Sequence, residues 1–499
     1  MALLRRWRPA LAALALALTG ALSAHAQDAR DSIRIGMNIE PAGLDPTAAA
    51  PVAIGQVVWQ NVFQGLTRID ENGQVLPQLA TEWAVSDEGR TVTFTLREGV
   101  RFQNGVAFDS STAKFTLDRA RGEGSINPQK QFFTKIRAVE TPDPRTLVLR
   151  LAEPSGDLLY HLAWPAAVMV EPSSAETNRS APVGTGPFRL AEWRQGDRLR
   201  LERIPNYWGP APALREAEFR FINDPQAQAA ALRSGAVDAF PEFGAPELVE
   251  ELKREERLSV VVGNTELKVV AGMNARRKPF DDARVRRALM MAVDRAAVIE
   301  GAWSGLGTPI GSHYTPNDPG YVDLANHVPY DPQAAKRLLA EAGYPDGFET
   351  TIRTPQMSYA TRSAEVLQAL LAEIGVTLRI VPTEFPAVWV EQVLKGHDFD
   401  MTIVAHGEPL DLDIYARPDY YFGYRNPAFD HTIAKAGRTL DDADRFALYG
   451  KAQRILADDL PALYLFVMPK LGVWDRRLTG LWSDEPIAAN DLTAVRWQP

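Results

Sequence analysis

The sequence contains no cysteine among its 499 residues. This absence excludes disulfide bonds, a thiolate nucleophile, a cysteine-ligated metal and a lipid-modified cysteine behind a leader. Only seven histidines are present, and their scattered positions show no spacing typical of metal ligands. A protein of this composition that is exported must be stabilised by packing alone.

Long apolar runs are also absent, apart from one near the N-terminus. Three arginines precede an Ala/Leu-rich run at 11–22, and Ala24-His25-Ala26 ends it with small residues at the two positions that signal cleavage requires. The run is shorter than the roughly 20 residues that span a bilayer. We therefore predict a cleaved signal peptide over residues 1–26, export to the periplasm and no stable membrane insertion.

The chain has little excess positive charge anywhere else. Its net charge is −9, or about −12 without the three N-terminal arginines, which argues against nucleic acid as a partner. The length predicts two or three lobes with cores of their own. Gly184-Thr-Gly-Pro187 precedes a strand pattern rather than a helix, so we expect a tight turn there and no cofactor.

Regular α/β patterning begins near residue 269. Strands are predicted at 348–353, 376–381 and 399–404, with helices between them at about 359–374 and 386–395. This alternation predicts parallel pairing with right-handed crossovers. Two earlier helices are expected, one after the cap Asp281 or Asp282 and one after the cap Asp331. The part from about 60 to 180 shows hairpin patterns at 91–96 and 139–151, which indicate a structural rather than a chemical role.

The segment 406–424, which we call the acidic aromatic loop, follows the third of these strands. It contains His406, four carboxylates and five aromatic rings, interrupted by prolines and glycines. We expect a long loop at the carboxyl end of a sheet strand, where ligands of open α/β sheets collect. A second loop, 354–362, leaves the same edge and should bring Arg362 close to it.

Eight short segments, each weak alone, occur in an order and spacing that are specific together. They are Phe63-Gln-Gly-Leu-Thr67, Pro77-Gln-Leu-Ala80 with Trp83, Phe94-Thr-Leu-Arg-Glu-Gly-Val-Arg-Phe102, Gly184-Thr-Gly-Pro187, Asn206-Tyr-Trp208, Ser234-Gly-Ala-Val-Asp238, Pro279-Phe-Asp-Asp with Val285-Arg-Arg-Ala-Leu289, and Tyr330-Asp-Pro with Ala335-Lys-Arg-Leu-Leu339. On these segments nearly all of the mature chain resembles the bacterial extracellular solute-binding proteins of the dipeptide, oligopeptide and nickel type, family 5, which serve ABC importers.

The resemblance implies an α/β, two-lobed periplasmic-binding-protein fold with an extra subdomain inserted in the first lobe. Two strand crossings, near 267–274 and 463–467, would link lobes that close over a ligand and present the closed form to the permease subunits of an ABC importer. A monomer is expected. The expected parts are 27–62, 179–268 and 464–499 for lobe I, 63–178 for the inserted subdomain and 269–463 for lobe II.

The resemblance also implies a site. In such proteins the position of Asp411 carries an acid that pairs with a peptide's amino terminus, and the position of His406 faces the ligand; here the common Asp-Pro is Asp411-Leu412. A carboxylate on one loop and Arg362 on another would hold the ends of a zwitterion, covered by tyrosines. The candidate ligand-binding residues are His406, Glu408, Leu410, Asp411, Asp413, Arg362, Tyr359, Tyr420, Tyr421, Asn38 and Glu40.

Other functions remain open on the sequence. Asp411-Leu-Asp413 hints at a metal, but a calcium loop would need a ligand and a glycine where Tyr415 and Ala416 stand, so we expect no direct metal site. Nickel chelates, opines or another non-peptide solute are alternative ligands. An exported hydrolase is a further alternative, against which no Gly-x-Ser-x-Gly or His-Glu-x-x-His motif occurs. A receptor component or chaperone on the same scaffold is a third.

Overall fold

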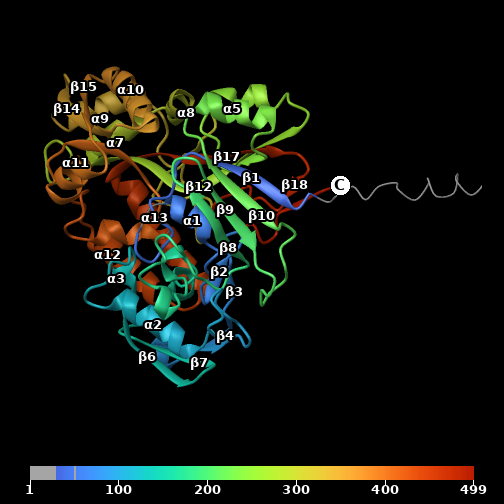
Figure 1. Ribbon diagram of the computed structural model, residues 1–499. Helices are drawn as coiled ribbons and strands as arrows, with labels where there is room; N and C mark the ends of the chain where they lie inside the picture. The colour runs from blue at the N-terminus through green and yellow to red at the C-terminus, as the bar shows by residue number, and fades with distance from the viewer. Residues whose placement is uncertain (1–29, 50–51, 409) are drawn as a thin grey trace, which may run out of the picture.

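The computed structural model describes residues 30–499 except 50, 51 and 409 (Figure 1). The predicted signal peptide, 1–26, lies outside the described residues. Among the described helices, none combines the length and apolarity that crossing a bilayer requires.

The largest element is a mixed sheet of eleven strands. Its order is β15-β14-β16-β12-β17-β11-β1-β10-β9-β8, with β13 paired to β17. The strands are β1 (Ser32–Met37), β8 (Phe188–Arg194), β9 (Arg198–Arg203), β10 (Glu216–Phe221), β11 (Ala239–Phe240), β12 (Leu258–Met273), β13 (Thr308–Pro309), β14 (Phe348–Pro355), β15 (Val376–Thr383), β16 (Met401–His406) and β17 (Ala462–Asp475).

The two long strands β12 and β17 run through both halves of this sheet and pair antiparallel along most of their length. On one side of them the buried residues between 269 and 467 form one core, which we call lobe II. On the other side, buried residues at 33–69, 160–219 and 474–495 form a second core, called lobe I. The α/β, two-lobed fold predicted from the sequence is thereby confirmed, whereas the exact residue boundaries stay predictions.

Lobe II has the predicted strand–helix alternation. β14 pairs parallel with both β15 and β16, so the three strands end at one edge of the sheet. The helix between β14 and β15 is α10 (Ser358–Ala372). The second expected helix is distorted, because α11 (Ala387–Trp389) continues as the π-helical turn η5 (Val390–Lys395).

Two further helices of lobe II begin at the predicted caps. The side chain of Asp282 accepts a hydrogen bond from the Arg284 amide at the start of α7 (Ala283–Met291). The side chain of Asp331 accepts one from the Ala334 amide at the start of α9 (Pro332–Glu341). Both carboxylates satisfy amides that the first helical turn leaves without partners.

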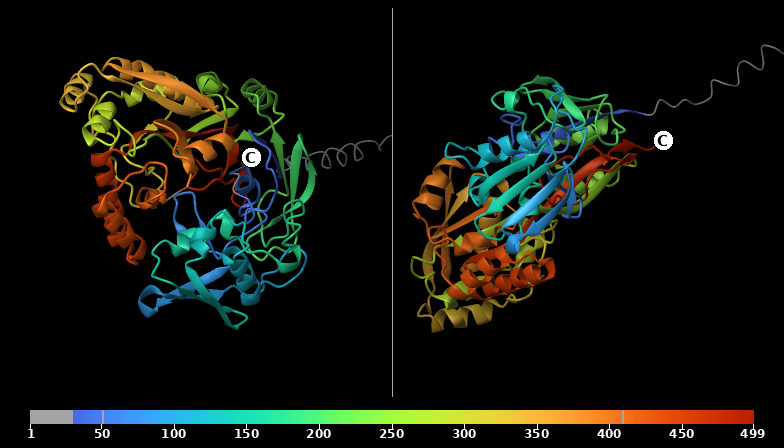
Figure 2. Two further views of the ribbon diagram at one scale, coloured as in Figure 1. Left: turned by 90° about the vertical axis from the view of Figure 1, so that its left-hand side faces the viewer. Right: turned by 90° about the horizontal axis from the view of Figure 1, so that it is seen from below.

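A small four-stranded sheet, β4-β5-β7-β6, has a core of its own at residues 66–169, and we call this part the small subdomain. The predicted hairpin at 139–151 is confirmed as the antiparallel pair β6 (Ile136–Asp143) and β7 (Thr146–Leu151). The small subdomain lies at the opposite end of the molecule from helices α9 and α10 (Figures 1 and 2). Its status as an insertion, at 63–178, stays a prediction.

The Gly184-Thr-Gly186 segment forms a tight turn in lobe I, as expected. The Gly186 amide donates to the Val62 carbonyl at 2.9 Å. A Cβ atom at Gly184 would lie 1.9 Å from the Val62 carbonyl oxygen, so no larger residue fits without moving the backbone.

The remaining elements complete both lobes and the small subdomain. The helices and short turns are α1 (Val52–Val58), α2 (Ser110–Arg121), α3 (Lys130–Phe133), α4 (Leu158–His161), α5 (Pro225–Ser234), α6 (Val249–Leu252), α8 (Arg295–Trp303), α12 (Pro427–Arg438), α13 (Asp442–Asp459), η1 (Asp87–Gly89), η2 (Pro165–Ala167), η3 (Pro172–Ser174), η4 (Pro246–Leu248) and η6 (Asp411–Ala416). The remaining strands are β2 (Thr67–Ile69), β3 (Val75–Pro77), β4 (Ala80–Ser86), β5 (Thr91–Leu96), β18 (Leu478–Thr479) and β19 (Arg496–Trp497).

Candidate ligand-binding cleft

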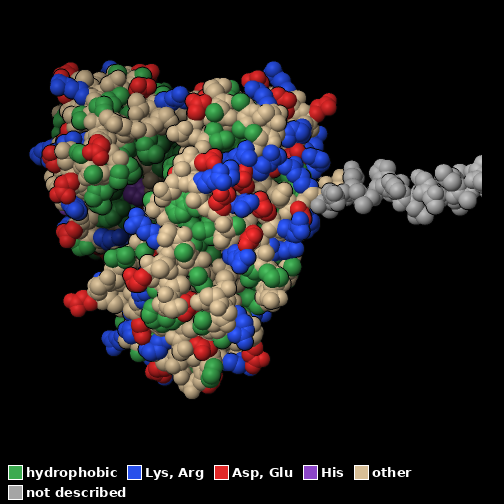
Figure 3. Space-filling view, viewed as in Figure 1, with side chains coloured by type: hydrophobic (Ala, Val, Ile, Leu, Met, Phe, Trp, Pro, Cys, Tyr) green, Lys and Arg blue, Asp and Glu red, His purple; other side chains and the backbone are tan. Residues whose placement is uncertain are grey.

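A cavity of about 530 Å³ lies where lobe I, the small subdomain and lobe II meet. Figure 3 shows a hollow between the lobes, bordered by hydrophobic side chains. The volume is in the range of small-molecule sites. Its walls include Pro46, Gly55, Trp164, Glu485 and Ile487 from lobe I, Pro128 and Gln129 from the small subdomain, Thr265, Glu266 and Leu267 from β12, and Phe385, Trp389, Val404, His406, Glu408 and Tyr420 from lobe II.

The bend between the lobes lies at residues 265–267 of β12. Asn264 pairs with Pro469 and Lys268 pairs with Val467, so three residues of β12 stand opposite Met468 alone. The Thr265 hydroxyl donates to the Met468 carbonyl at 2.8 Å and secures this bulge. Such an interruption of the ladder gives the strands a local bend, and here it faces the cavity.

The strand before the acidic aromatic loop ends two residues later than predicted, because β16 continues through His406, which lies opposite Lys268 of β12. Leu410 then adopts a left-handed backbone with a φ of 56°, and η6 follows. The loop leaves the carboxyl end of a strand, as its sequence indicates.

Most rings of this loop pack in the core of lobe II rather than facing a ligand. Tyr415, Tyr421, Phe422 and Tyr424 are all buried, and only Tyr420 lines the cavity. This burial strands no charge, because three of the loop's four carboxylates, Glu408, Asp413 and Asp419, are exposed. The one buried carboxylate of the loop has a partner inside the protein.

That buried carboxylate is Asp411, which is 7% exposed and forms an ion pair with the fully buried Lys268. The Lys268 ammonium lies 3.3 Å from Asp411 Oδ1 and donates a hydrogen bond to the Glu408 carbonyl at 2.6 Å. Burial by itself raises the pKa of Asp411, but Lys268 and His313 outweigh it and hold this pKa below its ordinary value. The position that would receive a ligand's amine therefore already holds an ammonium from the chain.

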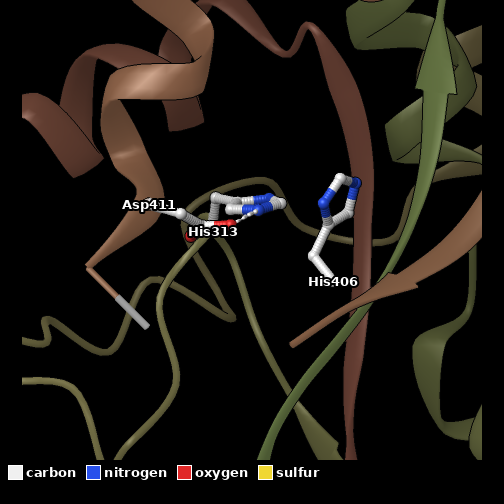
Figure 4. A group of neighbouring side chains, drawn as sticks. All are labelled: His313, His406 and Asp411. Atoms are coloured by element: carbon white, nitrogen blue, oxygen red, sulfur yellow. Dashed lines mark hydrogen bonds and ion pairs between the residues drawn. The ribbon is translucent and has the colours of Figure 1, made fainter. Parts of the chain in front are cut away.

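Two histidines support the same loop (Figure 4). His313 Nε2 donates to Asp411 Oδ2 at 3.2 Å, and its Nδ1 lies 3.0 Å from the Tyr415 hydroxyl. His406 Nε2 lies 2.8 Å from the Tyr421 hydroxyl. Burial, followed by the neighbouring His313, lowers the pKa of His406 well below its ordinary value, so this ring is neutral at physiological pH.

His313, His406 and Asp411 bring potential metal-ligand atoms within 4.8 Å of one another. Both ring nitrogens of His313 and the Nε2 of His406 already have hydrogen-bond partners, and a divalent cation beside Asp411 would face the Lys268 ammonium at short range. The arrangement is better suited to holding the loop in place than to binding a cation.

Three of the residues predicted to bind ligand line the cavity, namely His406, Glu408 and Tyr420. Others lie directly behind them: Tyr421 contacts His406, and the Tyr359 hydroxyl accepts a hydrogen bond from the Ala405 amide at 3.0 Å. Tyr359 thus brings the 354–362 loop to the end of β16, as the strand order predicts.

The remaining candidates lie away from the described cavity walls. Leu410 packs against both lobe cores, and Asp413 is exposed and paired with Arg417 at 2.9 Å. Arg362 is exposed on α10. Asn38 donates to the Glu242 carbonyl at 2.8 Å, and Glu40 accepts hydrogen bonds from the Trp193 indole and the Gly196 amide.

Several cavity residues escaped the sequence analysis. Glu266, with Lys268 behind the wall, stands out as a charge in an otherwise uncharged strand, which is a usable signal of a special role. Glu485 and Trp164 lie in irregular segments that gave no signal. Trp389, expected in the core, is buried with its indole nitrogen donating to the Thr402 hydroxyl at 2.9 Å, and it also forms part of the cavity wall.

Two lobes joined by two long strands around a cavity are the architecture of a two-lobed periplasmic solute-binding protein. Residues 74–429, more than half of the chain, match the family described as bacterial extracellular solute-binding proteins, family 5 Middle.

Curated relatives and solved structures agree with this match. The glutathione-binding protein GsiB of Salmonella paratyphi A is 31% identical over 94% of this chain and 95% of that protein. The binding protein AgaA of A. tumefaciens R10, solved with agropinic acid, has a TM-score of 0.78 at 25% identity and covers 94% of this chain and 99% of that one. DppA of Helicobacter pylori, solved with the peptide STSA, has a TM-score of 0.79 at 24% identity over 94% and 99% of the two chains.

The chain belongs to family 5 of the bacterial extracellular solute-binding proteins, and it serves as the substrate-binding component of an ABC importer. The relatives are binding proteins rather than enzymes.

Proposed function

We propose that the protein captures a small peptide-like solute in the cavity between its lobes and delivers it to the permease of its importer. The observation that carries this proposal is the composition of the cavity wall, to which lobe I, the small subdomain, β12 and lobe II all contribute. A solute there touches both sides of the bend at 265–267. Its binding therefore stabilises the closed arrangement over an open one.

The peptide-like character is supported by the GsiB relatives, whose name gives glutathione as ligand. His406, Glu408 and Tyr420 are the predicted residues placed to touch the solute. Asp411, with Lys268 and His313, holds the loop that presents them. In this proposal Asp411 positions other residues and does not bind the amine itself.

An opine is the second candidate, supported by the similarity to AgaA with agropinic acid. We further propose export by the predicted signal peptide, action in the periplasm as a monomer and presentation of the closed form to the permease subunits.

Mass spectrometry of the solute carried through purification, followed by thermal-shift measurements, tests this function. A bound peptide-like molecule in one-to-one ratio should raise the melting temperature, because a ligand that binds only the folded state stabilises it. A panel of peptides, glutathione, opines and nickel chelates that produces no stabilisation would contradict the proposal. An opine alone as stabiliser would favour the second candidate.

A further inference from the structure

The cavity has three carboxylates and no lysine or arginine among its described lining residues. Glu266 comes from β12, Glu408 from lobe II and Glu485 from lobe I. The three positions that the structure leaves out between 30 and 499 are an alanine and two prolines, which carry no charge. A solute in this cavity therefore meets negative side chains from three parts of the chain.

These carboxylates form no ion pair within the described residues. Lys268, the cation near Glu266, is paired with Asp411 instead, and Lys470 acts on Glu485 without forming an ion pair with it. Glu266 and Glu485 are each only 6% exposed. Buried acids are usually paired, so two that line a cavity without partners indicate that the partner comes from outside.

The backbone of Glu485 is bonded to β12 at the bend that contains Glu266, and both side chains line the cavity. The Glu485 amide donates to the carbonyl of Asn264 at 2.8 Å, two residues before Glu266 in β12. Glu266 itself has a hydroxyl neighbour, Thr315, with Oγ1 at 3.4 and 3.5 Å from its two oxygens.

Burial and neighbouring carboxylates raise the pKa of both acids. Burial and Asp318 raise the pKa of Glu266, against Lys268, and Asp411 adds to the rise. Burial and Glu242 raise the pKa of Glu485 to about 8, against Lys470 and a hydrogen bond from Gln56. A cation placed beside them would lower both pKa values.

Aromatic side chains supply the rest of a cation site. The cavity is lined by Trp164 from lobe I and by Phe385, Trp389 and Tyr420 from lobe II. Aromatic faces attract ammonium and guanidinium groups and also cover apolar carbon chains. No cation of the described lining residues would compete with a solute for these faces.

We propose that the solute of this cleft carries a net positive charge, with an ammonium or guanidinium group between Glu266 and Glu485 and its carbon body against the aromatic walls. The inference rests on the proposed function and makes its substrate class more specific. The carboxylate of a plain zwitterion finds no lysine or arginine on these walls, and Arg362, expected from the sequence to hold it, is exposed on α10 outside the cavity.

Calorimetric titration of the full mature chain with three matched dipeptides tests the inference. Alanyl-lysine, alanyl-norleucine and alanyl-glutamate share a backbone and differ in side-chain charge. We expect alanyl-lysine to bind at least about tenfold more tightly than alanyl-norleucine, as for a charge-assisted contact, and alanyl-glutamate to bind most weakly. The solute identified by mass spectrometry should be cationic at neutral pH.

Glu485→Gln and Glu266→Gln should each remove most of the preference for alanyl-lysine over alanyl-norleucine. Glu391→Gln, an exposed acid of lobe II, is the matched control and should retain the preference. If a variant does not fold, the three-peptide comparison on the unaltered chain remains decisive.

The outcomes separate the inference from the function beneath it. Binding of the neutral or acidic peptide at least as tightly as the basic one, or an anionic natural solute, overturns the cationic class and leaves a peptide-binding function intact. Failure of every peptide to bind, with no peptide-like solute recovered, overturns both.

Discussion

The buried ion pair between Lys268 and Asp411 allows a quantitative test of how the acidic aromatic loop is held. Lys268→Met removes the ammonium while keeping a side chain of similar length. Asp411 is then a buried carboxylate without its cation, and breaking a buried pair in this way costs about 3–5 kcal/mol of folding stability. The lost hydrogen bond to the Glu408 carbonyl adds to the loss.

Protonation of Asp411 limits this loss. Neutralising a carboxyl whose unfolded pKa is about 3.9 costs about 4 kcal/mol at pH 7, at about 1.4 kcal/mol per pH unit. In the unaltered protein the pKa of Asp411 is depressed, so its stabilisation is present above about pH 4 and is lost only as the pH falls through the lower folded-state pKa. In Lys268→Met burial dominates and raises that pKa, so the folded variant binds one more proton than the unfolded chain.

The difference in unfolding free energy between the two proteins should therefore shrink by about 1.4 kcal/mol per unit as the pH falls from 7 to 5. Urea denaturation followed by circular dichroism at several pH values measures it. Lys268→Met combined with Asp411→Asn should lose this pH dependence, because no carboxylate remains to titrate. Lys395→Met, which breaks an exposed pair, is the control and should cost under about 1 kcal/mol.

A deficit below about 1 kcal/mol at pH 7 would refute this account, since it would mean that Lys268 contributes no more than an exposed charge. A large deficit that does not change between pH 7 and pH 5 would also refute it, because the loss would then come from packing rather than from the charge on Asp411.

Three further predictions concern ligand binding. Cation binding should release protons at pH 7, because it lowers the raised pKa of Glu485, and affinity for alanyl-lysine relative to alanyl-norleucine should therefore rise between pH 6 and 8. Calorimetric titration in buffers of different ionisation enthalpy measures the proton release. Glu485→Gln should abolish the part of the release that Glu485 contributes. In fluorescence titrations, Tyr420→Ala should weaken solute binding about tenfold, whereas Arg362→Ala should change the affinity less than about twofold. Equal effects of the two substitutions would mean that the residues lining the cavity are wrongly assigned. Small-angle scattering should show a smaller radius of gyration with solute than without it, and identical dimensions would contradict closure.

Much of lobe II was predictable because local patterns there agree with the tertiary structure. The apolar periodicity at 348–404 predicts three parallel strands, and their order alone places the 406–424 loop and Tyr359 at one edge. Helix starts followed from capping residues such as Asp282 and Asp331. The split of the chain into lobes came from the resemblance to a family, because contacts between distant segments leave no periodic signal.

The site was less predictable for the same reason. The sequence drew attention to Asp411 but gave no information on its partner, since Lys268 precedes it by more than a hundred residues in another strand. The rings of the loop were expected around a ligand, and most of them fill the core instead, because neither composition nor spacing distinguishes the two roles. Glu485 lies in an irregular segment where no motif marks it.

The bulge at residues 265–267 has a consequence for the order of events during capture. Residues at a hinge move least when two lobes close. Glu266 and Glu485, which line the cavity at this bend, would therefore offer a solute nearly the same surroundings before and after closure. Trp164 belongs to lobe I and Tyr420 to lobe II, so closure of the lobes would change the distance between these two rings. In the proposed order of events, the charge of the solute is therefore recognised by the carboxylates before the lobes close. The aromatic rings contact the solute from both sides only after closure.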